Sequence, residues 1–331
     1  MKKKELSFKK LEKYLPFFEH PKFITYQYLA FLFGIIQVKE ETRPWLSCNF
    51  IWCDNFSFGD KDIWRIEQGV LQRELLFDSI LSINKETTIS EIQEQIEKGY
   101  YISGLYDEFY DPHKWAYGIE HNEHDFLLTG YDDFSESFIS YGYIKGKKFR
   151  KYMIQYKDFI NAFSSPMVES KAFRMRINPS FKFEFSWIGF LDELYRYIKQ
   201  PLLVATEPIN GYSGISTWKS MYIHIDNTIN KKEMLDMQRL RFLVEHKLHI
   251  LSCFDYIKTQ FDILNDQSVL YSAFIEEMKV FFNLGLKYCI KRDVCILDKM
   301  MVLLLELFEK ESEILNDALR IVLNYGGEIL F

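Results

Sequence analysis

The chain has 331 residues, of which 48% are hydrophobic and 17% aromatic, and its formal net charge is −6. This composition excludes a disordered or low-complexity chain and supplies enough apolar surface for one large domain or two. The acidic balance argues against a general nucleic-acid binder, which would carry a basic surface.

Neither membrane insertion nor secretion is expected. No window reaches the roughly 18 uninterrupted apolar residues that a transmembrane helix needs. The basic segment MKKKELSFKKLEK at the N-terminus lacks the apolar core of a signal peptide. The odd number of cysteines and the absence of a C-x-x-C pair predict reduced thiols in a cytoplasmic protein. The cysteines are Cys48, Cys53, Cys253, Cys289 and Cys295.

Helices are expected first along the chain. Residues 5–38 have a helical pattern interrupted at Pro16 and Pro21, and the apolar segment 23–38 predicts a buried central helix. Three further helices are predicted: a short one in WLSCNFIWCDNF (45–56), one over 63–84, and one in TTISEIQEQIEKGY (87–100), which has capping signals at both ends.

An antiparallel meander is predicted next, over residues 100–156. YYISGLYDEFY alternates and is rich in aromatic residues, and HDFLLTGYDD, SFISYGYIKG and KFRKYMIQY follow as three strands separated by turn residues. YKDFINAFSS (156–165) predicts a helix after the meander. These elements make residues 1–165 the first predicted domain.

The remaining sequence is predicted to be mixed and then helical. Residues 166–230 suggest a strand in KFEFSW (182–187), a helix over 188–199 and a loop over 205–216, and are interpreted as a connecting region that returns to the core. From Lys231, apolar residues recur every three or four positions through 231–264, 268–290 and 297–326, so 231–331 is the predicted α-helical region.

The order of elements indicates an α+β chain with a papain-like core, in which N-terminal helices pack on an antiparallel sheet. In such folds a cysteine lies at the start of the central helix, where the helix dipole favours thiolate. A histidine on the facing sheet moves the proton, and a carboxylate or amide on the next strand orients it. Here His124 begins the second strand of the meander.

Three segments carry a family resemblance. KGYYISGLYDEFYDP (98–112), EHDFLLTGYDD (123–133) and YKDFINAF (156–163) resemble the papain-like proteins of peptide natural-product gene clusters. These proteins are similar to the N-terminal domain of the butirosin acyltransferase family and, more distantly, to the peptidase C39 fold. LVEHKLHIL (243–251) resembles their helical tail.

The resemblance implies acyl transfer with amide formation in natural-product biosynthesis. The acyl or aminoacyl group would arrive as a thioester on the phosphopantetheine arm of an acyl or peptidyl carrier protein, so no cofactor of the chain's own is implied. His124 matches the general base, and Asp107, Glu108 and Tyr110 match the acidic-aromatic strand, with a role in substrate binding.

The nucleophile departs from the family pattern. Thr25 occupies the position nearest to the expected cysteine, and Gln27 is polar but not nucleophilic. Cys48, which lies 76 residues before His124, is the alternative nucleophile. The next strand offers Ser140 where the family pattern has a carboxylate or amide. The second hypothesis is therefore a catalytically inactive homologue that acts as a binding or scaffold partner.

Several structural interpretations compete with these functional ones. His124 could be a strand-end histidine bonded to nearby backbone. Asp107 and Glu108 are expected on opposite faces of a strand, so they do not form a paired-acid site, and surface exposure is favoured over one of them facing the cleft. His121 with His124 is a poor zinc spacing, so no metal is expected. A third hypothesis is a helical interaction protein, with a homodimer through the long helices left open.

Overall fold

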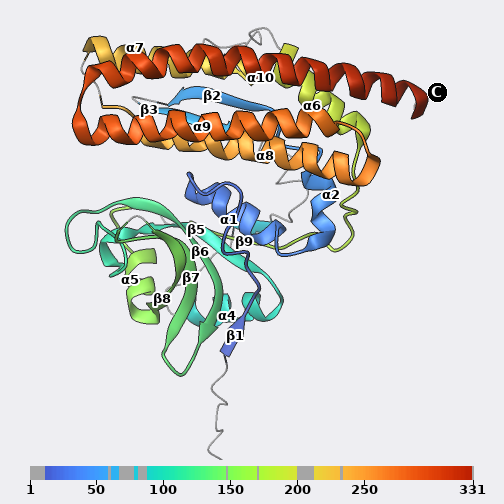
Figure 1. Ribbon diagram of the computed structural model, residues 1–331. Helices are drawn as coiled ribbons and strands as arrows, with labels where there is room; N and C mark the ends of the chain where they lie inside the picture. Colours follow the sequence, from blue (N-terminus) through green and yellow to red (C-terminus); the bar gives the residue numbers. More distant parts are fainter. Residues whose placement is uncertain are drawn as a thin grey trace, which may run out of the picture. The chain divides into compact units, whose positions relative to one another are not determined.

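The computed structural model describes residues 12–58, 61–66, 78–80, 88–146, 148–169, 171–199, 212–231 and 234–329. The chain forms two compact units, one from residues 1–38 and 69–181 and one from residues 39–68 and 182–331 (Figure 1). These limits differ from the predicted ones at 165 and 230, since the segment 39–68 groups with the helical part of the chain.

The first unit is built on an antiparallel sheet, and the predicted meander is confirmed as its centre. Strands follow the order β4-β9-β5-β6-β7-β8, and β1 pairs with the end of β6 beyond β5. The bounds are β1 Glu12–Tyr14, β4 Asp78–Ile80, β5 Tyr101–Asp107, β6 Glu123–Asp132, β7 Ser137–Ile144, β8 Lys148–Gln155 and β9 Lys171–Met175.

Two helices pack on opposite faces of this sheet. Phe31 of α1 (Gln27–Ile36) lies 6.3 Å from Phe149 of β8, whereas Phe159 of α5 (Tyr156–Phe163) lies 5.1 Å from Phe138 of β7. Phe138 pairs with Ile154, and residues 149 and 154 of one strand point to opposite faces. The predicted central helix is confirmed: nine of the ten residues of α1 are buried. The helix predicted in 87–100 is confirmed as α4 (Thr88–Glu97).

The second unit is mainly helical. Its longest helices α8, α9 and α10 run side by side, and a small antiparallel sheet has the order β10-β2-β3 (Figure 1). The bounds are η1 Glu40–Thr42, α2 Arg43–Leu46, β2 Cys53–Phe58, β3 Lys61–Ile66, α6 Trp187–Lys199, β10 Tyr212–Ser213, η3 Gly214–Ser216, α7 Thr217–Lys231, α8 Met237–Phe261, α9 Asn265–Lys291 and α10 Val294–Ile329. None of the helices in the described ranges combines the length and apolarity needed to cross a bilayer.

Four sequence-based predictions of secondary structure before residue 200 were wrong. The helix expected over 5–38 begins only at Gln27, because residues 12–14 pair with β6 instead. The helix expected over 63–84 is replaced in its described parts by β3 and β4, whose pairing with other strands overrides local helical pattern. In 45–56, α2 ends at Leu46 and β2 begins at Cys53. KFEFSW forms no strand, and Trp187 begins α6.

The predicted long helix from Lys231 is interrupted. α7, which was not predicted, ends at Lys231, and α8 begins only after Asp236. The Asp236 carboxylate accepts a hydrogen bond of 2.8 Å from the backbone N–H of Gln238, so it caps a new helix. Of the predicted loop over 205–216, residues 205–211 lie outside the described part of the chain.

Candidate functional site

His124 lies at the start of β6, and the polar contacts of its ring are made by Nδ1. Nδ1 is 2.7 Å from Oδ1 of Asp125 and 3.6 Å from Oε1 of Glu108. It is also 3.3 Å from Nε2 of Gln27, the first residue of α1. The side chain is 41% exposed, so solvent reaches part of it. The two carboxylates therefore orient a half-exposed imidazole.

Gln27 holds the start of α1 against the sheet. Its Nε2 donates to the carbonyl oxygen (2.7 Å) and to Oδ1 (3.2 Å) of Asp125, and its Oε1 accepts from the backbone N–H of Tyr143 (2.7 Å). A Cβ at Gly142 would lie 2.9 Å from Gln27 Oε1, so glycine leaves room for this amide. The buried amide is thus fixed at the position on α1 that faces His124.

The charge around His124 favours its protonated form. Burial lowers the pKa of His124, but the hydrogen bond and charge of Asp125 and the charge of Glu108 outweigh it, and the pKa lies above its ordinary value. A protonated Nδ1 donates to Asp125, and Gln27 donates to the same carboxylate. The ring therefore holds its proton more strongly than a free imidazole does.

A buried ion pair lies next to His124. Lys114 and Glu108 have side chains only 2% and 4% exposed, with 3.6 Å between Nζ and Oε1. Lys114 also donates to the carbonyl oxygen of Tyr143 (2.8 Å). Burial lowers the pKa of Lys114, but Tyr152, Glu108 and further carboxylates raise it above its usual value, so the lysine stays charged.

His121 has a carboxylate partner of its own. Its Nδ1 is 2.6 Å from Oδ2 of the fully buried Asp107, and Ser165 Oγ donates to the same oxygen at 2.6 Å. Burial raises the pKa of Asp107, but hydrogen bonds from Ser165, His121 and two backbone N–H groups hold it below its usual value. Because the serine bonds to the aspartate and not to the imidazole, the three residues do not form an activated-serine triad.

The residues of the predicted acidic-aromatic strand lie close to His121 and His124. Asp107 ends β5, Glu108 and Tyr110 lie in the following turn η2 (Glu108–Tyr110), and the ring of Tyr110 is 6.2 Å from that of His121. The expectation that the two carboxylates are exposed was wrong, since Asp107 is 0% and Glu108 3% exposed. Each is satisfied by hydrogen bonds to the segment that leads into β6.

The other predicted partners of His124 have different roles. Ser140 donates to the carbonyl oxygen of Leu127 (2.8 Å) within the sheet. Thr25 is buried two residues before α1. The carboxylates at the ring come from Asp125 and Glu108, and the helix presents Gln27. Sequence reasoning did not assign these roles, and the only signal was a polar residue at the start of an apolar helix.

Cys48 belongs to the second unit and is a buried structural thiol. Its side chain is 1% exposed, and its sulfur accepts from the backbone N–H of Ser186 (3.3 Å) and donates to the carbonyl oxygen of Trp45 (3.3 Å). Burial is the main cause that raises the pKa of Cys48 to about 11. The thiol is therefore protonated at neutral pH. All five cysteines of the sequence lie outside 1–38 and 69–181, the unit that carries His124.

His246 and His249 of α8 have structural roles. Both are fully buried, and their Nε2 atoms bond to the carbonyl oxygens of Ile51 (2.8 Å) and Asn49 (2.7 Å). Burial lowers the pKa of His246 well below its ordinary value, so its ring is neutral. In the described ranges, no group of three or more His, Cys, Asp or Glu side chains is arranged to hold a metal ion.

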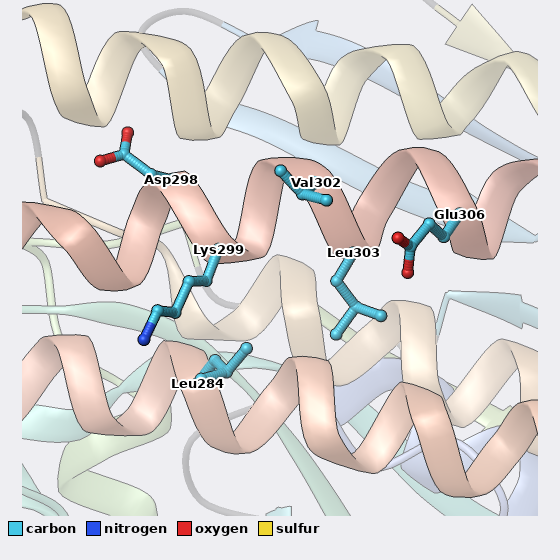
Figure 2. Close-up of a pocket in the computed structure, with 6 residues that line it drawn as sticks. All are labelled: Leu284, Asp298, Lys299, Val302, Leu303 and Glu306. Atoms are coloured by element: carbon cyan, nitrogen blue, oxygen red, sulfur yellow. The ribbon is translucent and has the colours of Figure 1, made fainter.

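A shallow groove of about 460 Å³ lies on the helical unit (Figure 2). Leu284 of α9 and five residues of α10 line it. The lining residues are Leu284, Asp298, Lys299, Val302, Leu303 and Glu306. The lining contains no histidine, cysteine or hydroxyl group, so this groove offers surface for contact and no nucleophile.

No protein-family model matches the sequence, and no curated protein matches it.

Proposed function

We propose that the first unit is a catalytically inactive papain-like domain that binds a carrier-protein-bound acyl or aminoacyl thioester. The observation that carries this proposal is the 3.3 Å contact between Gln27 Nε2 and His124 Nδ1. In a papain-like enzyme the side chain at the start of the central helix that faces the histidine is the cysteine. An amide there donates hydrogen bonds but cannot attack a thioester.

The state of His124 fits this proposal. Its Nδ1 lies against Asp125 and Gln27, and its raised pKa favours imidazolium. An imidazolium would also stabilise a thiolate in a thiol enzyme, so the argument against nucleophilic turnover rests on Gln27 and not on the charge of the ring. Without a thiol beside it, the charged ring offers a contact for a polar or anionic group.

The thiol-dependent acyltransferase is the competing proposal, with Cys48 as its nucleophile. Its support is the resemblance around His124, together with the carboxylates that orient the ring. A thiol with a pKa of about 11 is a poor starting point for it, because little thiolate exists at neutral pH.

The experiment mixes the wild-type protein with a phosphopantetheinylated peptidyl carrier protein that is loaded with an aminoacyl group and carries a fluorophore. Anisotropy measures binding, and intact-protein mass spectrometry measures acyl adducts. We expect saturable binding without an adduct and without amide formation when an amine is added. An adduct that disappears in Cys48→Ala would instead establish the acyltransferase, and the absence of binding would remove the proposed function.

A second proposal concerns the helical unit. α9 and α10 expose large apolar side chains, with Val280 54%, Ile290 82%, Val302 60% and Leu305 51% exposed. Such a surface favours association, and a homodimer through these helices is the simplest form of it. Sedimentation of the wild type and of Val302→Lys/Leu305→Lys tests this: a dimer should become a monomer in the variant.

A further inference from the structure

The hairpin of β7 and β8 carries the most basic short segment of the central sheet. Residues 145–151, KGKKFRK, contain five basic residues and no acidic one, in a chain whose net charge is −6. Lys145, Lys148, Arg150 and Lys151 are all exposed. None of these four forms an ion pair with a described residue, so no carboxylate in the described part of the chain neutralises their charge.

Two of the cations share one face of the hairpin, and a third lies in its turn. β8 pairs with β7 without a break in register, so Lys148 and Arg150 point to the same face as Tyr152. Lys151 points to the other face, where its Nζ lies 4.3 Å from the ring centre of Tyr14. Lys145 lies in the turn. We call Lys145, Lys148 and Arg150 the basic hairpin patch.

The loop that leads to the two histidines is attached to this patch. The backbone N–H of Lys145 donates to the carbonyl oxygen of His113 (2.8 Å), and the rings of His113 and Tyr152 lie 4.9 Å apart. The Nζ of Lys145 is 5.1 Å from the ring centre of Tyr117. The position of the loop beside the patch is therefore fixed by backbone, ring and cation contacts.

This loop exposes large apolar side chains. Trp115 is 57%, Tyr117 44% and Ile119 73% exposed. Aromatic residues and arginine are enriched at protein interfaces, where they supply most of the binding energy. The loop ends at His121, only two residues after Ile119, so anything bound here lies next to the histidine site.

We propose that the basic hairpin patch and the exposed residues Trp115, Tyr117 and Ile119 form a docking surface for a partner protein with an acidic surface. The inference rests on the proposed function, for which that partner is the carrier protein. The cations attract and orient the acidic face, and the apolar side chains become buried on contact.

Neither protection of a sheet edge nor nucleic-acid binding accounts for the whole surface. Lysines on an edge strand prevent sheets from joining, and β8 is the edge strand of its sheet, but edge protection does not explain three exposed apolar side chains beside the cations. A nucleic acid would be attracted by the patch, but tight binding needs a wider basic surface than three cations in an acidic chain.

The test compares two triple variants for binding of the fluorescent, aminoacyl-loaded carrier protein. Lys145→Glu/Lys148→Glu/Arg150→Glu reverses the patch. Lys287→Glu/Lys291→Glu/Lys299→Glu reverses three exposed lysines of the helical unit and changes the net charge equally. We expect affinity to fall about tenfold or more in the first variant and less than about twofold in the second, with a weaker salt dependence in the first. Trp115→Ala should weaken binding without changing the salt dependence.

The outcomes separate this inference from the proposed function. If both triple variants bind the carrier protein as the wild type does, the docking surface is wrong and the proposed function stands. If the wild type binds no carrier protein, the proposed function fails and the inference with it. A DNA duplex that binds the wild type more tightly than the carrier protein and is lost on patch reversal would overturn the assignment to a protein. A patch-dependent dimer in sedimentation would overturn it in favour of a second copy.

Discussion

Each unit buries a lysine beside a glutamate, but the surroundings of the two pairs differ. In the second unit, Lys247 and Glu311 lie 3.0 Å apart and are both 0% exposed. Glu311 also accepts from Trp218 Nε1 (2.6 Å) and from the hydroxyl of Tyr271 (2.5 Å). In the first unit, Lys114 and Glu108 are buried too, but Glu108 also faces the half-exposed ring of His124.

The comparison separates a structural network from a site. Around Glu311, the lysine, tryptophan and tyrosine that contact the carboxylate are all buried side chains of the helical unit, so the network stabilises the packing. Around Glu108, the buried charge orients a group that solvent reaches. A buried charged cluster becomes a candidate functional site where one of the groups it orients is accessible to a ligand. Of these two pairs, Lys114 and Glu108 meet that condition, because Glu108 faces His124.

The largest effect on stability is expected when the buried network around Glu311 is broken. Glu311→Gln leaves Lys247 buried without a counter-charge and should lower the free energy of unfolding by about 3–5 kcal/mol. Urea unfolding followed by circular dichroism measures it. Replacing both partners, in Lys247→Met/Glu311→Leu, should recover most of that loss, because the uncompensated charge is gone. A loss below about 1 kcal/mol in the single variant would contradict the structural role.

The next effect concerns the carboxylate behind His121. Asp107→Asn weakens hydrogen bonds to a buried charge and should cost about 2–3 kcal/mol at neutral pH. Because the pKa of Asp107 lies below its unfolded value, its contribution is present above an unfolded pKa of about 3.9 and is lost as the pH falls through the folded value. The difference in unfolding free energy between wild type and variant should therefore shrink below about pH 4. A difference that stays constant with acidification would count against a charge-assisted network.

His124 should show the opposite pH dependence. Its pKa is raised, so its stabilising contribution is complete below an unfolded pKa of about 6.5 and is lost as the pH rises through the folded value. The stability difference between wild type and His124→Gln should be larger at pH 5.5 than at pH 8.5. His113→Gln serves as the matched control. Equal differences at both pH values would mean that Asp125 and Glu108 do not hold an imidazolium.

The last prediction concerns the reactivity of the thiols. Their modification should affect the fold least, and it tests the acyltransferase proposal directly. Cys289 is half-buried and Cys295 exposed, whereas Cys48, Cys53 and Cys253 are buried. An aromatic disulfide reagent should modify two thiols in the folded protein and all five after unfolding. Mass mapping that finds Cys48 among the fast thiols would revive the acyltransferase with Cys48 as nucleophile.

Local patterns in the sequence were enough to predict the central elements. The meander over 100–156 has alternating residues and turn signals within each strand pair, and α1 is apolar on nearly all sides, so neighbouring residues determine both. The strands β1 and β9 were missed because they have only three and five residues and pair with distant segments.

The candidate site could be predicted only in part. His124 was found from its place at the start of a strand. The roles of Gln27 and Glu108 follow from tertiary placement: Tyr106 pairs with His124 across β5 and β6, and α1 lies against the same sheet. Such a convergence depends on register and helix position, which no single segment of the sequence specifies.

The central claim is that Gln27 occupies the place of the missing nucleophile, and Gln27→Cys in a Cys289→Ser/Cys295→Ser background tests it most directly. The measurement is the pH dependence of alkylation of the new thiol by iodoacetamide, with circular dichroism to verify the fold. The account predicts an apparent thiol pKa below the ordinary value of about 8.5, and a rise towards that value when His124→Gln is added. A thiol pKa at or above about 8.5 that does not respond to His124 would contradict the account.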